Sequence, residues 1–171
     1  MRWALVVIFA YVLIVIQTTL FDTRLLAFQI LGVWIKPDLL LLMLLFIALR
    51  AEAVEVFIAG WALGLAEDLI VSEGPLGIGA LMFGTGGYLL TLFRRVLGRE
   101  RILTQVFLAL GLVFAVRLPQ QRLLFWFTGS SAGWLDVLEK ACGDAVYSAA
   151  LAPYLLWGLG KTAARGGAEG L

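Results

Sequence analysis

The residues of this chain that could carry chemistry are few, and they do not assemble into a catalytic motif. The chain has no histidine, so the side chain most often used as a general base or metal ligand is missing. Its single cysteine, Cys142, excludes an intrachain disulfide and a paired-cysteine metal site. The glycines between residues 74 and 87 lack the Gly-Lys-Ser/Thr and the preceding strand of a phosphate-binding loop. We therefore expect no enzyme, no cofactor and no metal site.

The adjacent carboxylates Glu67 and Asp68 are harder to place. They follow the preceding acidic residue by only 12 positions, which is about 18 Å of helix against a bilayer core of about 30 Å. We expect them to open a solvated loop. The alternative is a buried carboxylate that pairs with Arg117, Lys36 or an external subunit, because an unpaired charge in a membrane is costly. We expect Arg117 and Asp144 at helix ends near the membrane surface, where they would be solvated.

The elements that must position these side chains are membrane-spanning helices. Of the 171 residues, 62% are hydrophobic and 15% charged, whereas a typical soluble domain has about 45–50% and about 25%. A span needs about 20 apolar residues. The predicted fold class is an all-α membrane protein, a compact bundle of about six transmembrane helices in one integral-membrane domain, residues 1–171. The expected spans lie at about residues 3–21, 37–50, 54–67, 75–93, 101–118 and 145–160.

Local signals set the ends of the less regular segments. Pro37 is a good helix start, because proline lacks a donor that the first helical turn does not need. Arg50 and the two glutamates after it predict a tight turn between the second and third helices. Pro119 is expected to terminate the fifth span. The apolar segments 25–35 and 123–135 are too short or too aromatic to be spans, so we expect them at the membrane interface.

The distribution of basic residues predicts the orientation. Six spans put both termini on one side, and that side holds eight Lys and Arg residues against five on the other. The positive-inside rule therefore places both termini in the cytoplasm. The basic loop that decides the count contains Arg94, Arg95, Arg99 and Arg101.

Gly60 and Gly64 form a GxxxG pair within the third predicted span, with Asp68 at its outer end. Small residues let helix backbones approach closely in a bilayer. Because the chain has 19 glycines, such a pair also arises by chance. Its position inside a span makes it a candidate for helix packing or for docking a partner.

Several short motifs, taken in order, resemble the MreD family of rod shape-determining proteins. They are Gln17-Thr-Thr-Leu, Lys36-Pro37-Asp38-Leu39, Gly60-x3-Gly64-x3-Asp68, and Gly74-Pro75-Leu76-Gly77 opening the span that carries Tyr88. The resemblance runs from about residue 10 to residue 95 and marks eight candidates for helix packing or partner docking. These are Gln17, Pro37, Asp38, Gly60, Gly64, Asp68, Gly77 and Tyr88.

The resemblance implies a non-enzymatic, multi-pass scaffold in the bacterial inner membrane, part of the cell-elongation complex that directs peptidoglycan synthesis. Members of the family associate with the periplasmic protein MreC and, through the complex, with actin-like MreB filaments. The same assembly includes a SEDS-family glycosyltransferase and a penicillin-binding transpeptidase. The family also resembles, in its six-helix fold, the substrate-capture subunits of energy-coupling-factor transporters. The alternative function is therefore a vitamin-binding subunit of such a transporter, with an outward pocket lined by polar groups.

Overall fold

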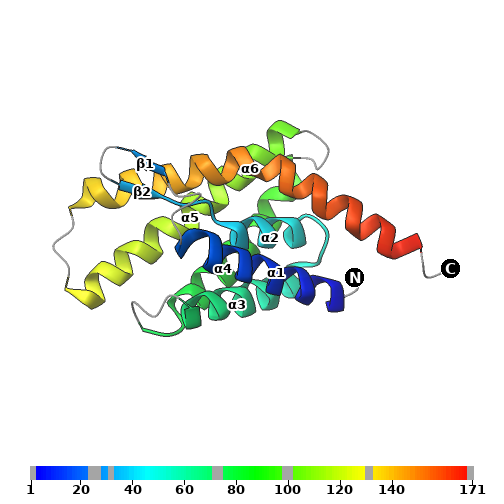
Figure 1. Cartoon of the computed structure of the whole chain (residues 1–171), viewed down its shortest axis with the longest axis horizontal. Coiled ribbons are helices and arrows are strands. Elements are labelled where there is room, and N and C mark those ends of the chain that lie inside the picture. Colours follow the sequence, from blue (N-terminus) through cyan, green and yellow to red (C-terminus); the bar gives the residue numbers. More distant parts are fainter. Residues whose placement is uncertain are drawn as a thin grey trace.

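The computed structural model describes residues 3–22, 28–30, 33–70, 75–97, 102–129 and 133–168. Within these ranges the chain forms six helices and one short β-hairpin (Figure 1). The helices are α1 (Trp3–Asp22), α2 (Leu39–Ala48), α3 (Ala53–Ile70), α4 (Ile78–Leu97), α5 (Ile102–Thr128) and α6 (Trp134–Ala168). The helical architecture agrees with the expected fold class.

The β-hairpin lies in the segment that was expected to be part of an interfacial loop. Strands β1 (Phe28–Ile30) and β2 (Val33–Ile35) pair antiparallel, with Gln29 opposite Trp34. β2 packs against α6, and Figure 1 shows the hairpin beside the first half of that helix. Hydropathy alone predicted no strand here, because a short apolar run does not distinguish a strand from other buried structure.

Helix α2 forms the centre of the bundle. Nine of its ten residues are buried, and each of the other five helices contacts it. A helix that is apolar on every face must be surrounded by protein or lipid, and here the other helices surround it. At ten residues it is about 15 Å long, half the thickness of a bilayer core.

Polar groups close both ends of α2. At its start, the Asp38 carboxylate accepts a hydrogen bond from the Leu41 N–H at 3.1 Å, which makes Asp38 the N-cap. At its end, the Arg94 guanidinium on α4 donates to the carbonyl oxygens of Ala48 and Ala51. The chain then turns and enters α3, and the turn coincides with the charges around Arg50.

The expectation that Pro119 ends the fifth helix is wrong. Pro119 lies inside α5, which continues to Thr128 and has 27 residues. Membrane helices tolerate proline because neighbouring groups and small local adjustments satisfy the carbonyl that it leaves free. Residues 123–128 therefore extend α5, and α6 already begins at Trp134, so the segment 123–135 is largely helical.

Within the described ranges, one helical stretch is long and apolar enough to cross a membrane. It is Thr104–Phe127 in α5, and the shorter apolar helices are Val7–Gln17 and Leu39–Ala48. The start of α1 and the end of α6 lie toward the same end of the longest axis (Figure 1). At the opposite end, the α5–α6 hairpin projects beyond the other helices (Figure 1).

Candidate functional site

Arg117 on α5 is the centre of a buried polar cluster. Its Nε and Nη2 donate to Asp38 Oδ2. Its Nη1 donates to Glu67 Oε1 at 2.6 Å and to Gln120 Oε1 at 2.9 Å. We call Asp38, Glu67, Arg117 and Gln120 the Arg117 network. It joins the start of α2, the end of α3 and the middle of α5.

The burial of this network corrects two expectations. The Arg117 side chain is 15% exposed, and those of Asp38 and Glu67 are 2% and 7% exposed. The expectation of a solvated Arg117 and a solvated Glu67 is wrong, and the alternative, in which Glu67 pairs with Arg117, is what the structure shows. The error at Arg117 follows from the error at Pro119, because the continued helix keeps Arg117 far from the end of α5. A planar guanidinium offers five N–H donors, enough to serve two carboxylates at once.

Helix α6 holds the same site from the other side. The Ser148 hydroxyl accepts a hydrogen bond from the Asp38 N–H at 2.8 Å, and Asp144 Oδ1 accepts one from the Lys36 N–H at 3.0 Å. Residues four positions apart lie on one face of a helix, so both side chains reach the segment that leads into α2. Asp144 is 5% exposed, which corrects the expectation of a solvated helix end.

Asp68 connects α3 to the start of α4. Its two carboxylate oxygens accept hydrogen bonds from the N–H groups of Gly77 at 2.8 Å, Gly79 at 3.0 Å and Ala80 at 3.3 Å. The first N–H groups of a helix have no partner within it and favour a negative charge. Gly77 has a φ of +107°, which a residue with a side chain rarely adopts. Asp68 is therefore a helix-capping residue rather than a free surface carboxylate.

Gly60 and Gly64 lie against α4 of the same chain. A Cβ atom at Gly60 would be 2.7 Å from the Phe83 carbonyl oxygen, and one at Gly64 would overlap the carbonyl of Gly79. Both glycines are buried. The small-residue face of α3 therefore serves internal packing, and α4 occupies the surface that a partner would need.

The remaining candidates have different positions. Pro37 is buried before α2, and Gln17 on α1 is partly buried, with no hydrogen-bond partner for its Oε1 among the described residues. Tyr88 on α4 is 44% exposed. Of the predicted basic loop, Arg94 binds the end of α2. The side chain of Arg95 and the whole of Arg99 and Arg101 lie outside the described residues.

Sequence reasoning missed Gln120 and Ser148, and it did not recognise the central position of Arg117. A usable signal was present: between residues 102 and 121 the only charged residue is Arg117. A lone ionisable residue inside an apolar span is rarely tolerated without a partner. That argument predicts a buried carboxylate elsewhere in the chain, although it does not say which one.

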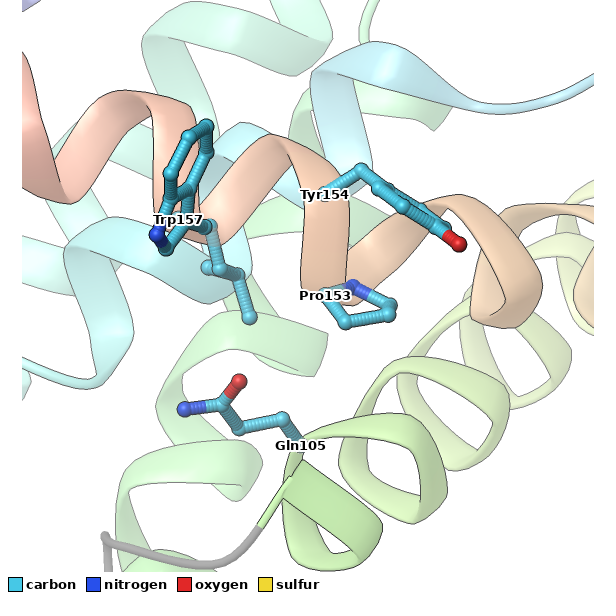
Figure 2. A pocket seen from close by; sticks show the side chains of 5 residues that line it. Gln105, Pro153, Tyr154 and Trp157 are labelled. Atoms are coloured by element: carbon cyan, nitrogen blue, oxygen red, sulfur yellow. The ribbon is translucent and has the colours of Figure 1, made fainter.

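A separate groove of about 530 Å³ lies between α5 and α6. Figure 2 shows Gln105 of α5 facing Pro153 of α6, with the rings of Tyr154 and Trp157 beside them. Leu156 completes the lining, so the polar side-chain groups among its described residues are the Gln105 amide, the Tyr154 hydroxyl and the Trp157 N–H. A pocket for a polar solute needs several converging polar groups, and this apolar lining does not provide them.

Comparison with known protein families identifies a family for this chain. A family model described as rod shape-determining protein MreD matches residues 1–133. The matched part contains Asp38, Glu67 and Arg117 and ends just before α6. No curated protein and no solved structure matches the chain.

Proposed function

Because the chain belongs to the MreD family of rod shape-determining proteins, we propose that it is a non-enzymatic scaffold subunit of the bacterial cell-elongation complex. The family places it among membrane proteins with a role in rod shape determination. The finer proposal is a multi-pass inner-membrane protein with both termini in the cytoplasm. It would dock an MreC-type partner and link peptidoglycan synthesis to actin-like MreB filaments.

The observation that supports this proposal best is that the charged side chains inside the bundle bind other segments of the same chain. Asp38, Glu67 and Arg117 bind one another, Asp68 binds the start of α4, and Arg94 binds the end of α2. Each of these groups holds two segments of the bundle together. A vitamin-binding subunit would need such groups to line an open cavity, whereas here Arg117 of α5 binds Asp38 at the start of α2 and Glu67 of α3.

The proposed docking surface is the outward face of α3 and α4. Among the eight candidates that the family resemblance marks, Tyr88 is the one whose side chain is exposed. Trp61 on α3 is 47% exposed and Leu92 on α4 is 44% exposed. Aromatic side chains of this kind dominate the energetics of protein interfaces. We therefore assign this face to the transmembrane helix of an MreC-type protein, in place of the buried Gly60 and Gly64.

Co-purification tests the proposal. The full chain, extracted in mild detergent, should recover an MreC-type protein expressed from the same cell. Replacing Trp61 and Tyr88 with alanine should reduce that recovery without changing the melting temperature. Tyr154→Ala is the matched control, because Tyr154 is 76% exposed on α6. A wild-type chain that purifies alone would refute the scaffold, and thermal stabilisation by a vitamin would favour the transporter alternative.

A further inference from the structure

We propose that the α5–α6 hairpin sets the depth of the bundle in the bilayer and that its tip rests in the lipid headgroup layer. The tip consists of residues 123–128 of α5 and residues 134–139 of α6. This inference rests on the proposed membrane embedding of the bundle and not on the identity of any protein partner. The occupant that we assign to the exposed tip is the phospholipid headgroup region.

Two segments of equal length define the hydrocarbon depth. Residues 102–121 of α5 contain one charged residue, Arg117, and residues 141–160 of α6 contain one, Asp144. Both of these are held inside the bundle, by Asp38 and Glu67 in the first case and by the Lys36 N–H in the second. Twenty helical residues span about 30 Å, which equals the thickness of a bilayer core.

The two segments pack side by side. Gln105 of α5 lines one groove with residues between Pro153 and Trp157 of α6 (Figure 2). Because the two helices run antiparallel, moving 17 positions outward from Gln105 and from these α6 residues places Arg122 level with residues 136–140. Arg122 and Lys140 are both exposed, so they mark one boundary of the core. Lys161, whose Nζ lies 3.7 Å from the Trp157 ring centroid, marks the other.

The tip beyond Arg122 and Lys140 has the composition of a membrane interface. Trp126 is 81% exposed, Phe127 61%, Trp134 51% and Leu135 76%. The Arg122 guanidinium carbon lies 5.4 Å from the Trp134 ring centroid. Tryptophan is enriched at headgroup level, where one part of the ring is apolar and the N–H can bond to water.

The height of the tip favours lipid over a partner in the aqueous phase. Six residues on each side of the turn extend it by about 9 Å, and the headgroup layer adds about 5–7 Å to each side of the core. Figure 1 shows this hairpin as the part of the bundle that projects furthest at its end. Trp126 is four residues beyond Arg122 and so lies about 6 Å above the boundary. The Trp134 ring lies against the Arg122 guanidinium. Both rings therefore fall at the depth of the phospholipid headgroups.

Trp61 provides an internal reference for depth. Glu67 is bonded to Arg117, which precedes Arg122 by five residues, and Trp61 precedes Glu67 by six residues on α3. Five residues of α5 and six residues of α3, at about 1.5 Å each, place Trp61 about 16 Å below the level of Arg122, near the middle of the hydrocarbon core. With an exposed fraction of 47%, its ring is accessible to acyl chains.

Depth-dependent quenching tests the inference. Each of three variants of the full chain keeps Trp61, Trp126 or Trp134 and has phenylalanine at the other five tryptophan positions. The variants are reconstituted in phosphatidylcholine vesicles brominated near the headgroup or near the end of the acyl chain. The ratio of shallow to deep quenching should exceed one for Trp126 and Trp134 and fall below one for Trp61.

Two results would overturn the inference. The first is quenching of Trp126 as deep as that of Trp61, which would displace the boundary. The second is a response of Trp126 to aqueous acrylamide alone, which would leave the tip free for a protein partner. If the multiple replacement prevents folding, Trp126→Phe and Trp134→Phe in the otherwise native chain give the same information. Each should then reduce the share of total fluorescence that shallow bromines quench. Failure of the co-purification would leave these depths unchanged, so the two proposals fail separately.

Discussion

Replacing Arg117 with methionine should cause a large loss of stability. The change removes the one guanidinium that Asp38 and Glu67 share and leaves both carboxylates buried, with side chains 2% and 7% exposed. Removing one partner of a buried ion pair costs about 3–5 kcal/mol, because the remaining charge is not compensated. Here two carboxylates lose their partner, so we expect the upper end, about 5 kcal/mol. That approaches the whole stability of many proteins, about 5–15 kcal/mol.

Neutral substitutions distinguish the effect of charge on stability from the effect of side-chain shape in the Arg117 network. Glu67→Gln should cost about 1.5–3 kcal/mol, the range for a hydrogen bond to a charged group, since Arg117 keeps Asp38. The triple variant Asp38→Asn, Glu67→Gln, Arg117→Met carries no charge at these positions. It should recover most of the stability lost in Arg117→Met, because no uncompensated charge then stays buried.

The assay is the free energy of unfolding from reversible SDS titration in mixed micelles. Arg122→Met is the control on the same helix, since Arg122 is exposed and touches only the Trp134 ring among its described contacts. It should cost about 0.5–1 kcal/mol. An Arg117→Met chain as stable as Arg122→Met, or a triple variant no better than Arg117→Met, would refute the reasoning.

Three further changes test individual contacts by the melting temperature in detergent. Gly64→Ala should lower the melting temperature because the new Cβ overlaps the Gly79 carbonyl. The control is Gly111→Ala, where a Cβ meets nothing within 4 Å, and it should leave the melting temperature unchanged or higher. Equal effects would mean that α3 and α4 are not in close contact. Asp68→Asn should reduce the free energy of unfolding by about 1–3 kcal/mol and lower the melting temperature, because an amide NH₂ would face N–H groups that now donate to the carboxylate. An unchanged melting temperature would indicate that the Asp68 side chain is solvated. Ser148→Ala should reduce the free energy of unfolding by about 1–3 kcal/mol, because it leaves the buried Asp38 N–H without an acceptor. Val146→Ala, at an exposed position of the same helix, is the control. A smaller decrease in melting temperature for Ser148→Ala than for Val146→Ala would contradict the contact.

The sequence predicted the helices well where hydropathy and chain length determine them. The lipid-like composition and the uncharged runs anticipate α1 and α4, and the charges around Arg50 anticipate the turn between α2 and α3. The end of α5 was missed because the effect of Pro119 depends on what surrounds the helix, which a local rule does not contain. The pairing of residues 28–30 with 33–35 was missed because so short a run carries little periodicity.

The candidate site was less predictable, since its contacts join distant parts of the chain. Arg117 meets Glu67 from 50 positions away and Asp38 from 79, and no local pattern encodes such a pairing. The cost of a lone charge predicts that Arg117 has a partner, but it does not say which of the twelve carboxylates of the chain that partner is. Gly60 and Gly64 show the same limit: the small face is visible in the sequence, but whether α4 or a partner covers it is decided by the tertiary structure.

Photocrosslinking within intact membranes tests the central claim most directly. A benzoyl-phenylalanine placed at Tyr88 would probe the outward face of α4, and one at Tyr154 would probe α6, where the side chain is 76% exposed. The scaffold proposal predicts a crosslink to an MreC-type protein from position 88 and none from position 154. Crosslinks to lipid alone at both positions would contradict it.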